Sequence, residues 1–363
     1  MDEIAPKVTA PNWEVSSFRK ADLSAIGIFF RRVYKGYGVH GSMDYFQWKI
    51  ADNPVRPGVI NLVRTPAGIG SLTSLTPKVL FVMGQRMPAA EIGDTFTDLA
   101  YQRQGMFAML VNQTRLDGNG LGIDFIYGTP NDQSLPSYEK HANFKPITGI
   151  NVRALNFPVH VQMALQTRLP WIIASAAGFL WTLLVHFWSW AQTLLNAKNS
   201  WQIEEVSMLP VDWELFWEEA RTNNDFLLSR EREYLKWRYF DNPYRYHVLI
   251  ARRMGRIRGY LVYRLIMDER MPTLRIADYL SAPGEASVLA GLLTRVIQAA
   301  LEMGAVKVSA WCPSSNPHFR QFSAYGFQAG GEIPVICHQS AVARKIQQEC
   351  KIWHFSLGDS DNV

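Results

Sequence analysis

The sequence predicts a mixed α/β (α+β) protein with two similar domains, each a mixed sheet flanked by helices. At 363 residues the chain is longer than a single hydrophobic core usually extends. Strand-like and helix-like patterns alternate in both halves without the regular spacing of a parallel βαβ array. A motif of the first half also recurs in the second. Together these observations predict tandem domains.

The repeat is clearest in two ten-residue segments. Residues 45–54 read YFQWKIADNP and residues 234–243 read YLKWRYFDNP, so Tyr, Trp, a basic residue and Asp-Asn-Pro recur 189 positions apart. We expect each copy to be a helix that ends before its proline, because proline disfavours helical geometry in the preceding residue. Later segments match in the same order, which we interpret as a gene duplication. They are the strands containing Asp94 and Asp278, the apolar strands 123–127 and 306–311, and the turns at Asn143-Phe144 and Gly326-Phe327.

Four segments follow from this comparison. Residues 12–158 and 201–345 are predicted to form the two domains. Residues 159–200 between them form an apolar linker that we expect to be helical, and residues 346–363 are expected to be a tail.

Composition disfavours several functional classes. The net charge of +5 and the pI near 9.0 suit a polyanionic cofactor or an anionic membrane surface. No run of Lys and Arg is interleaved with aromatic residues, which disfavours nucleic acid as a partner. Cys312, Cys337 and Cys350 show neither disulfide nor metal spacing, and the eight histidines are scattered, so we expect a reducing compartment and no metal. The acidic, polar N-terminus lacks a signal-peptide pattern, so we expect a cytoplasmic protein.

Residues 97–110, TDLAYQRQGMFAML, have the features of a phosphate-binding turn between a strand and a helix. Gly105 would allow an anion to approach the backbone closely, and a helix starting at Met106 would direct its positive end toward that anion. Arg103 adds a full positive charge. An ordinary strand-to-helix turn with one glycine is the alternative interpretation.

This turn resembles the Gln/Arg-x-x-Gly-x-Gly/Ala motif of the GNAT (GCN5-related) N-acyltransferases, with Phe107 in place of the usual small residue. Residues 127–134, YGTPNDQS, followed by Tyr138-Glu139-Lys140 and Asn143-Phe144, resemble the family's Asn-x-x-Ala, Tyr-x-Lys and Gly-Phe order. Here Ser134 replaces Ala and Asn143 replaces Gly. The paired YxxW…DNP segments resemble tandem GNAT-like proteins of bacterial surface-polysaccharide and lipid loci. The resemblance implies two GNAT-like domains with mostly antiparallel sheets.

The resemblance also implies acyl-CoA or acetyl-CoA as co-substrate, with the pantetheine along the strand before the turn and the diphosphate at the turn. The residues expected to bind it are Thr95, Phe96, Thr97, Gln102, Arg103, Gln104, Gly105, Met106, Phe107 and Asn131.

Acyl transfer to an amine requires an acid for the leaving thiolate and a base for the amine. Tyr138 matches the position of the family's frequent general acid, and a packing role on a helix is its alternative. Asp94 and Glu91 are the candidate bases, and a water relay remains open. Because they lie three apart on a strand, we expect them to point to opposite faces. Asp94 is preferred.

The corresponding loop of the second domain, residues 281–287, reads SAPGEAS and lacks the Gln/Arg-x-x-Gly pattern. Glu285 stands where a phosphate would lie. We therefore expect the second domain to bind the acceptor or to be structural, without binding CoA.

The linker segment 169–195 contains no Asp, Glu, Lys or Arg and is long enough to span a bilayer. Its four tryptophans suit an interface between lipid and water. A single crossing would separate the two similar domains, so a re-entrant or in-plane membrane helix is favoured over a simple span. A long helix buried between the domains is the alternative.

The leading functional hypothesis is a CoA-dependent N-acyltransferase located in the cytoplasm, at the inner face of the membrane if the linker contacts lipid. Its acceptor would be a primary amine: an amino sugar, a lipid-linked amine or a sphingoid base. A non-catalytic, membrane-associated acyl-CoA- or lipid-binding protein is the second hypothesis. An aminoacyl-tRNA-dependent transferase is the third, and the first-domain loop disfavours it.

Overall fold

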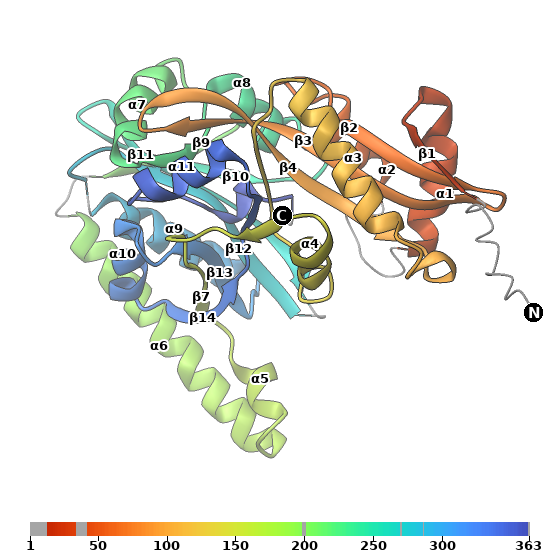
Figure 1. Ribbon diagram of the computed structural model, residues 1–363. Helices are drawn as coiled ribbons and strands as arrows, with labels where there is room; N and C mark the ends of the chain where they lie inside the picture. The colour runs from red at the N-terminus through yellow and green to blue at the C-terminus, as the bar shows by residue number, and fades with distance from the viewer. Residues whose placement is uncertain (1–12, 34–41, 198–200, 269–270, 286, 362–363) are drawn as a thin grey trace, which may run out of the picture.

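The computed structural model describes residues 13–33, 42–197, 201–268, 271–285 and 287–361. Two mixed, mainly antiparallel sheets, each with helices packed against it, form the molecule (Figure 1). This architecture confirms the predicted fold class.

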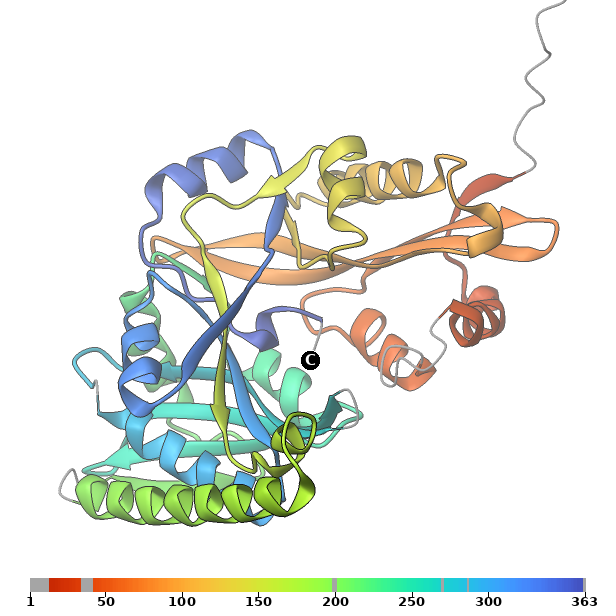
Figure 2. The ribbon, with the colours of Figure 1, turned by 90° about the horizontal axis from the view of Figure 1, so that it is seen from below.

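The first sheet has the strand order β1-β2-β3-β4-β5-β15-β6, and β9 pairs with β3. β4 and β5 are its parallel pair. The helices α3 and α4 cover one face, and α1 and α2 lie on the other (Figure 2). The strands are β1 Glu14–Ser17, β2 Val59–Thr65, β3 Gly68–Val82, β4 Gln85–Thr97, β5 Phe125–Gly128, β15 Ile336–His338, β6 Phe144–Pro146 and β9 Phe226–Leu228; the helices are α1 Leu23–Val33, α2 Met43–Ile50, α3 Met106–Gly120 and α4 Leu135–His141.

The second sheet has the order β14-β7-β13-β12-β11-β10-β8, with β12 and β13 parallel. α9 packs on this sheet and contributes a large part of its core. The strands are β14 Gln328–Ile333, β7 Val152–Pro158, β13 Lys307–Pro313, β12 Met271–Ser281, β11 Arg256–Asp268, β10 His247–Arg253 and β8 Gln202–Val206; the helices are α7 Trp213–Ala220, α8 Arg232–Leu235 with a π-helical turn at Lys236–Phe240, α9 Val288–Glu302 and α10 Pro317–Tyr325. α11, Ala341–Glu349, belongs to the second half of the chain but packs in an apolar cluster with Phe125 and Tyr127 of the first sheet.

The two sheets exchange strands. β7 belongs to the first half of the chain but lies between β13 and β14 of the second sheet. β15 belongs to the second half but lies between β5 and β6 of the first sheet. The predicted boundaries at residues 158 and 345 therefore divide the chain but do not divide the sheets.

Much of the segment predicted to be a tail is buried, as far as it is described. Residues 353–361 are almost completely shielded from solvent and contact both halves of the molecule. Tyr127 of the first sheet donates to the carbonyl of Asp359, and Arg238 of the second half donates to the carbonyl of Ser360 at 2.6 Å. Polar residues fill much of this segment, so no apolar pattern in the sequence indicated that it would be interior.

The repeated helices meet at the contact between the two halves. The rings of Trp48 and Trp237 stack with their centroids 4.5 Å apart. Each indole N–H donates to the backbone carbonyl of the other tryptophan, at 3.0 and 3.1 Å. The two motifs, which share their internal spacing, thus form a reciprocal contact that satisfies both buried indole N–H groups.

The apolar linker forms α6, Trp171–Ala197, preceded by the short helix α5, Gln162–Gln166. α6 runs along the outer side of the second domain beside α9 (Figures 1 and 2). Within the described ranges it is the one helix whose length and apolar composition would allow it to cross a membrane. It is not buried between the domains, so the alternative of an interdomain core helix is wrong.

Candidate functional site

The loop between β4 and α3 presents backbone amides to solvent. Asp98 accepts a hydrogen bond from the Ala100 N–H at 3.0 Å, which closes a short turn. Arg103 and Gly105 then adopt left-handed backbone geometry, with φ of 63° and 81°. No N–H group from residue 102 to 108 donates to a carbonyl or side chain of the described residues. These groups are available to an anion at the start of α3.

The start of α3 is also sterically open. A Cβ atom on Gly105 would meet no other atom within 4 Å, so glycine serves the backbone conformation here rather than relieving crowding. Phe107 does not fill the loop: its ring packs edge-to-face on Tyr138 at 5.0 Å, toward the core. The departure from the small residue of the GNAT motif therefore leaves the amides accessible.

β4 and β5 separate next to this loop. Glu91 and Tyr127 form the last pair between them, whereas β4 continues to Thr97. A register shift between β3 and β4 coincides with a left-handed residue, Asp94 (φ 48°). This β-bulge lies where the strands diverge, and such bulges redirect side chains near sites.

Tyr138 reaches the bulge from α4. Its hydroxyl lies 2.8 Å from Thr95 Oγ1, which lies 2.7 Å from Thr73 Oγ1. The ring is buried among apolar side chains, including Phe144. Burial raises the pKa of the Tyr138 hydroxyl, so it keeps its proton at neutral pH. Tyr138 both packs in the core and provides a proton donor at β4.

Asp94 is held in a buried ion pair. Its carboxylate pairs with Lys49 of α2 and accepts from Ser74 Oγ at 2.7 Å. Lys49 also lies 3.4 Å from Asp361. Burial opposes the charge on Lys49, but Asp94 and Asp361 outweigh it and raise the pKa of Lys49 above its usual value. Asp94 is thus largely committed to neutralising a buried cation.

Glu91 occupies a different environment on the same strand. It accepts from the Asp361 N–H at 3.1 Å and from Thr129 Oγ1 at 3.2 Å, and Lys78 Nζ lies 3.6 Å away. Burial, together with the nearby charge of Asp361, raises the pKa of Glu91 to about 8. A carboxyl group that titrates near physiological pH is suited to accept a proton.

The prediction that Glu91 and Asp94 point to opposite faces is wrong. Because the bulge inserts one residue, the Asp94 carboxylate reaches Ser74, which pairs with Gly93. Lys49, Asp361 and Lys78 then link the two carboxylates in one buried charge network.

The other predicted site residues divide into two groups. Gln102 and Arg103 are exposed at the loop, and Gln102 donates to the Thr97 carbonyl at 3.4 Å. Asn131 is exposed and accepts from the Ser134 N–H at 2.9 Å, so it stabilises the turn that leads into α4. The Met106 and Phe96 side chains pack into apolar clusters, which leaves only their backbone groups for a ligand.

Comparison with known proteins identifies the fold. No protein-family model matches the sequence, and no curated protein matches it. A protein of Enterococcus faecalis described as a probable N-acyltransferase matches the structure with a TM-score of 0.61 and 12% identity, covering 90% of this chain and 72% of that chain. A GCN5-related N-acetyltransferase from Anabaena variabilis matches with a TM-score of 0.60 and 13% identity, covering 90% of this chain and 72% of that chain. The N-myristoyltransferase of Saccharomyces cerevisiae, solved with myristoyl-CoA, matches with a TM-score of 0.59 and 11% identity, covering 96% of this chain and 86% of that chain.

The chain is a tandem GNAT-fold protein. The resemblance carried by residues 102–107 and 127–144 is therefore confirmed at the level of the fold.

In this tandem GNAT-fold protein, sequence reasoning missed the residues that surround the candidate carboxylates. They come from distant parts of the chain: Lys49, Ser74, Lys78 and Asp361. The sequence contains one indication of Lys49, which is the basic residue of the first repeat and corresponds to the buried Arg238 of the second. It contains no indication of Asp361, since no sequence pattern relates this residue to β4.

The second-domain loop that corresponds to the β4–α3 loop contains a carboxylate, Glu285, which pairs with two arginines of its own domain. Glu285 accepts from Arg253 and from Arg258, both at 3.1 Å. An internal carboxylate therefore occupies the arginines that could otherwise attract a phosphate. The described residues contain no group of His, Cys, Asp and Glu arranged to hold a metal.

Removing Lys49 tests the role of its ion pair. We expect Lys49→Met to lower the free energy of unfolding by about 3–5 kcal/mol, because Asp94 and Asp361 lose their buried counter-ion. Lys236→Met is the control, since the Lys236–Asp241 pair is exposed and contributes at most about 1 kcal/mol. Urea denaturation measures both variants. Equal losses would contradict this account of the buried network.

Proposed function

We propose that this tandem GNAT-fold protein is an N-acyltransferase that moves an acyl group from acyl-CoA to a primary amine. The observation that carries the proposal is the turn at residues 102–107, whose free amides and helix start lie beside the bulged end of β4. A diphosphate suits these groups, and Arg103 adds a positive charge on the exposed side. The yeast neighbour was solved with myristoyl-CoA, so the donor proposed here includes long-chain as well as acetyl thioesters.

Each proposed chemical role belongs to a residue near the strand separation. The amine nitrogen attacks the thioester carbonyl carbon, and the carbon–sulfur bond breaks. The departing thiolate takes the proton of the Tyr138 hydroxyl. The nitrogen transfers its proton to Glu91, directly or through a water molecule. We prefer Glu91 to Asp94 because Asp94 is paired with Lys49, whereas the Glu91 pKa is near 8.

The acceptor is proposed to be an amino sugar, a lipid-linked amine or a sphingoid base. We propose that the reaction takes place on the cytoplasmic side, at the inner face of the membrane. The apolar surface of α6 supports a location at a bilayer, where the protein can meet a lipid-linked amine or a sphingoid base.

Calorimetric titration with acetyl-CoA and longer acyl-CoAs, followed by thiol release with a panel of amines, tests the function. Binding followed by amine-dependent thiol release supports acyl transfer. Binding without release from any amine would favour a non-catalytic acyl-CoA-binding protein, and no binding heat would contradict both.

Replacing Tyr138 by Phe tests the proposed acid. We expect kcat to fall about a hundredfold, while the Kd for acyl-CoA is unchanged, because only the proton donor is removed. Tyr325→Phe is a matched control: Tyr325 is also buried, and its hydroxyl donates to Thr294 Oγ1 at 2.9 Å in the second domain. A Tyr138→Phe variant as active as the control would exclude Tyr138 as the acid.

A further inference from the structure

α6 has two apolar sides. Its 27 residues correspond to a length of about 40 Å at 1.5 Å per residue. One side packs on the second domain through Ala174, Val185 and Ser189, which recur at helical spacing and are buried. A helix on the surface of a soluble domain normally carries polar residues on its other side. Here the other side is also apolar.

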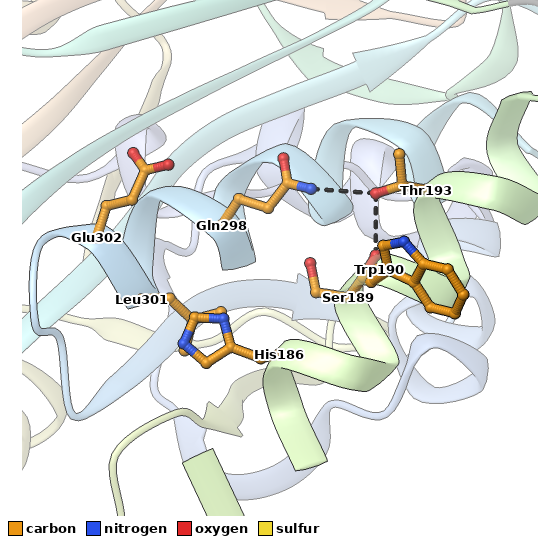
Figure 3. A pocket seen from close by; sticks show the side chains of 7 residues that line it. All are labelled: His186, Ser189, Trp190, Thr193, Gln298, Leu301 and Glu302. Carbon is orange, nitrogen blue, oxygen red and sulfur yellow. Dashed lines mark hydrogen bonds between the residues drawn. The ribbon is translucent and has the colours of Figure 1, made fainter. Parts of the chain in front are cut away.

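The inner side is attached along the helix. A Cβ atom on Gly178 would lie 2.6 Å from Gln162 Cβ, so α6 and α5 are in close contact. Trp188 packs edge-to-face on Tyr325 at 4.6 Å. Near the C-terminal end Gln298 Nε2 of α9 donates to Thr193 Oγ1 at 3.1 Å (Figure 3). The C-terminal half of α6 is therefore attached to the second domain and its N-terminal half packs on α5, so it is not an independent membrane span.

The outer side is a continuous apolar surface, which we call the α6 outer face. Leu180 and Phe187 are 60% and 65% exposed. The residues of the α6 outer face are Ile172, Ile173, Phe179, Leu180, Leu183, Leu184, Phe187, Trp190, Leu194 and Leu195. Because successive residues of a helix are about 100° apart, these side chains cover roughly half of the helix circumference, opposite the buried side. A surface of this size and composition indicates a partner.

We propose that the α6 outer face lies flat on a bilayer that contains anionic lipid, with the helix axis in the membrane plane. A single partner helix would cover only a narrow stripe, whereas acyl chains can surround half of a helix. Trp190, 58% exposed on this face, has the amphipathic ring that favours the interface. On the side toward α9, His186 lines a pocket between the two helices (Figure 3). The net charge of +5 and the exposed Arg168 just before the helix complement anionic headgroups.

Sedimentation of the full chain with vesicles tests the proposal. The vesicles contain equal parts phosphatidylcholine and phosphatidylglycerol. We expect the wild-type protein to bind and Leu180→Glu/Phe187→Glu to bind at least about tenfold less, because two large apolar side chains no longer enter the bilayer. The control, Leu215→Glu/Met254→Glu, changes residues 77% and 96% exposed outside α6, and we expect wild-type binding.

Three results would overturn the proposal. One is vesicle binding by the α6 variant equal to that of wild type. The second is a wild-type protein that ignores vesicles but forms a dimer in light scattering that the α6 variant abolishes, since a second copy would then cover the face. The third is stronger quenching of tryptophan fluorescence by lipids brominated at the chain end than by lipids brominated near the headgroup, which would indicate a spanning helix. Acyl-CoA binding measured on the same variants should be unchanged, so failure here is distinguishable from failure of the acyltransferase proposal.

Discussion

Gly105→Asp is expected to weaken acyl-CoA binding by about a hundredfold, equivalent to about 2.7 kcal/mol. The substitution places a carboxylate at the start of α3, where the proposed site binds a diphosphate, so like charges repel. Aspartate tolerates left-handed backbone better than most residues, and no atom lies within 4 Å of the new Cβ, so the fold should be retained. Calorimetry with acyl-CoA measures the change.

Gly122→Asp is the matched control. Gly122 follows the other end of α3, has φ of +79°, and a Cβ there would also meet no atom within 4 Å. Both variants carry the same added charge and similar backbone strain, but only Gly105 faces the proposed diphosphate. If the two variants bound acyl-CoA equally well, the loop would not be the cofactor site.

Glu91→Gln is expected to lower kcat by about a hundredfold to a thousandfold, because the amide cannot accept the amine proton. The pH profile provides a second readout. Glu91 acts as a base only when ionised, so wild-type activity should rise with pH through about 8, its raised pKa. The variant should lack this rise. Because the proposed acceptor amines titrate near or above neutrality themselves, the contribution of Glu91 is the difference between the wild-type and Glu91→Gln profiles measured with the same acceptor.

Two companion variants make this result specific. Glu285→Gln alters the carboxylate held by Arg253 and Arg258 in the second domain, and we expect an unchanged kcat and pH profile. Asp94→Asn tests the preference made from the sequence. If Asp94→Asn removed the rise near pH 8 while Glu91→Gln kept it, Asp94 would be the base.

The raised pKa of Glu91 should also make the stability of the folded protein depend on pH, in a direction that can be predicted. Between the ordinary pKa of 4.5 and about 8, Glu91 holds its proton in the folded protein but loses it in the unfolded chain. The folded state therefore binds more protons in this range, and its stability falls as pH rises. The wild-type Tm should decrease relative to that of Glu91→Gln across this window. A constant difference in Tm would contradict the raised pKa.

The sequence was sufficient for features that depend on local chemistry. The loop at residues 102–107, the helix beginning at Met106 and the apolar helix near 169–195 follow from glycine, charge and hydropathy patterns. Self-comparison predicted two domains, because the YxxW motif recurs at a fixed spacing. The same comparison indicated that Lys49 and Arg238 correspond, although it did not indicate that both are buried.

Only the tertiary structure decided which distant residues meet. β7 and β15 cross between sheets because strand pairing depends on the register and edges of the final sheets, which no local pattern encodes. The bulge at Asp94 turned a residue expected on one face toward Ser74 and Lys49, since one inserted residue changes the alternation of a strand. Burial, and then the charge of Asp361 from 270 positions away in the chain, raises the pKa of Glu91. The sequence thus determined the elements and the turn at residues 102–107, whereas long-range packing and burial decided that Asp94 pairs with Lys49 and that the pKa of Glu91 is raised.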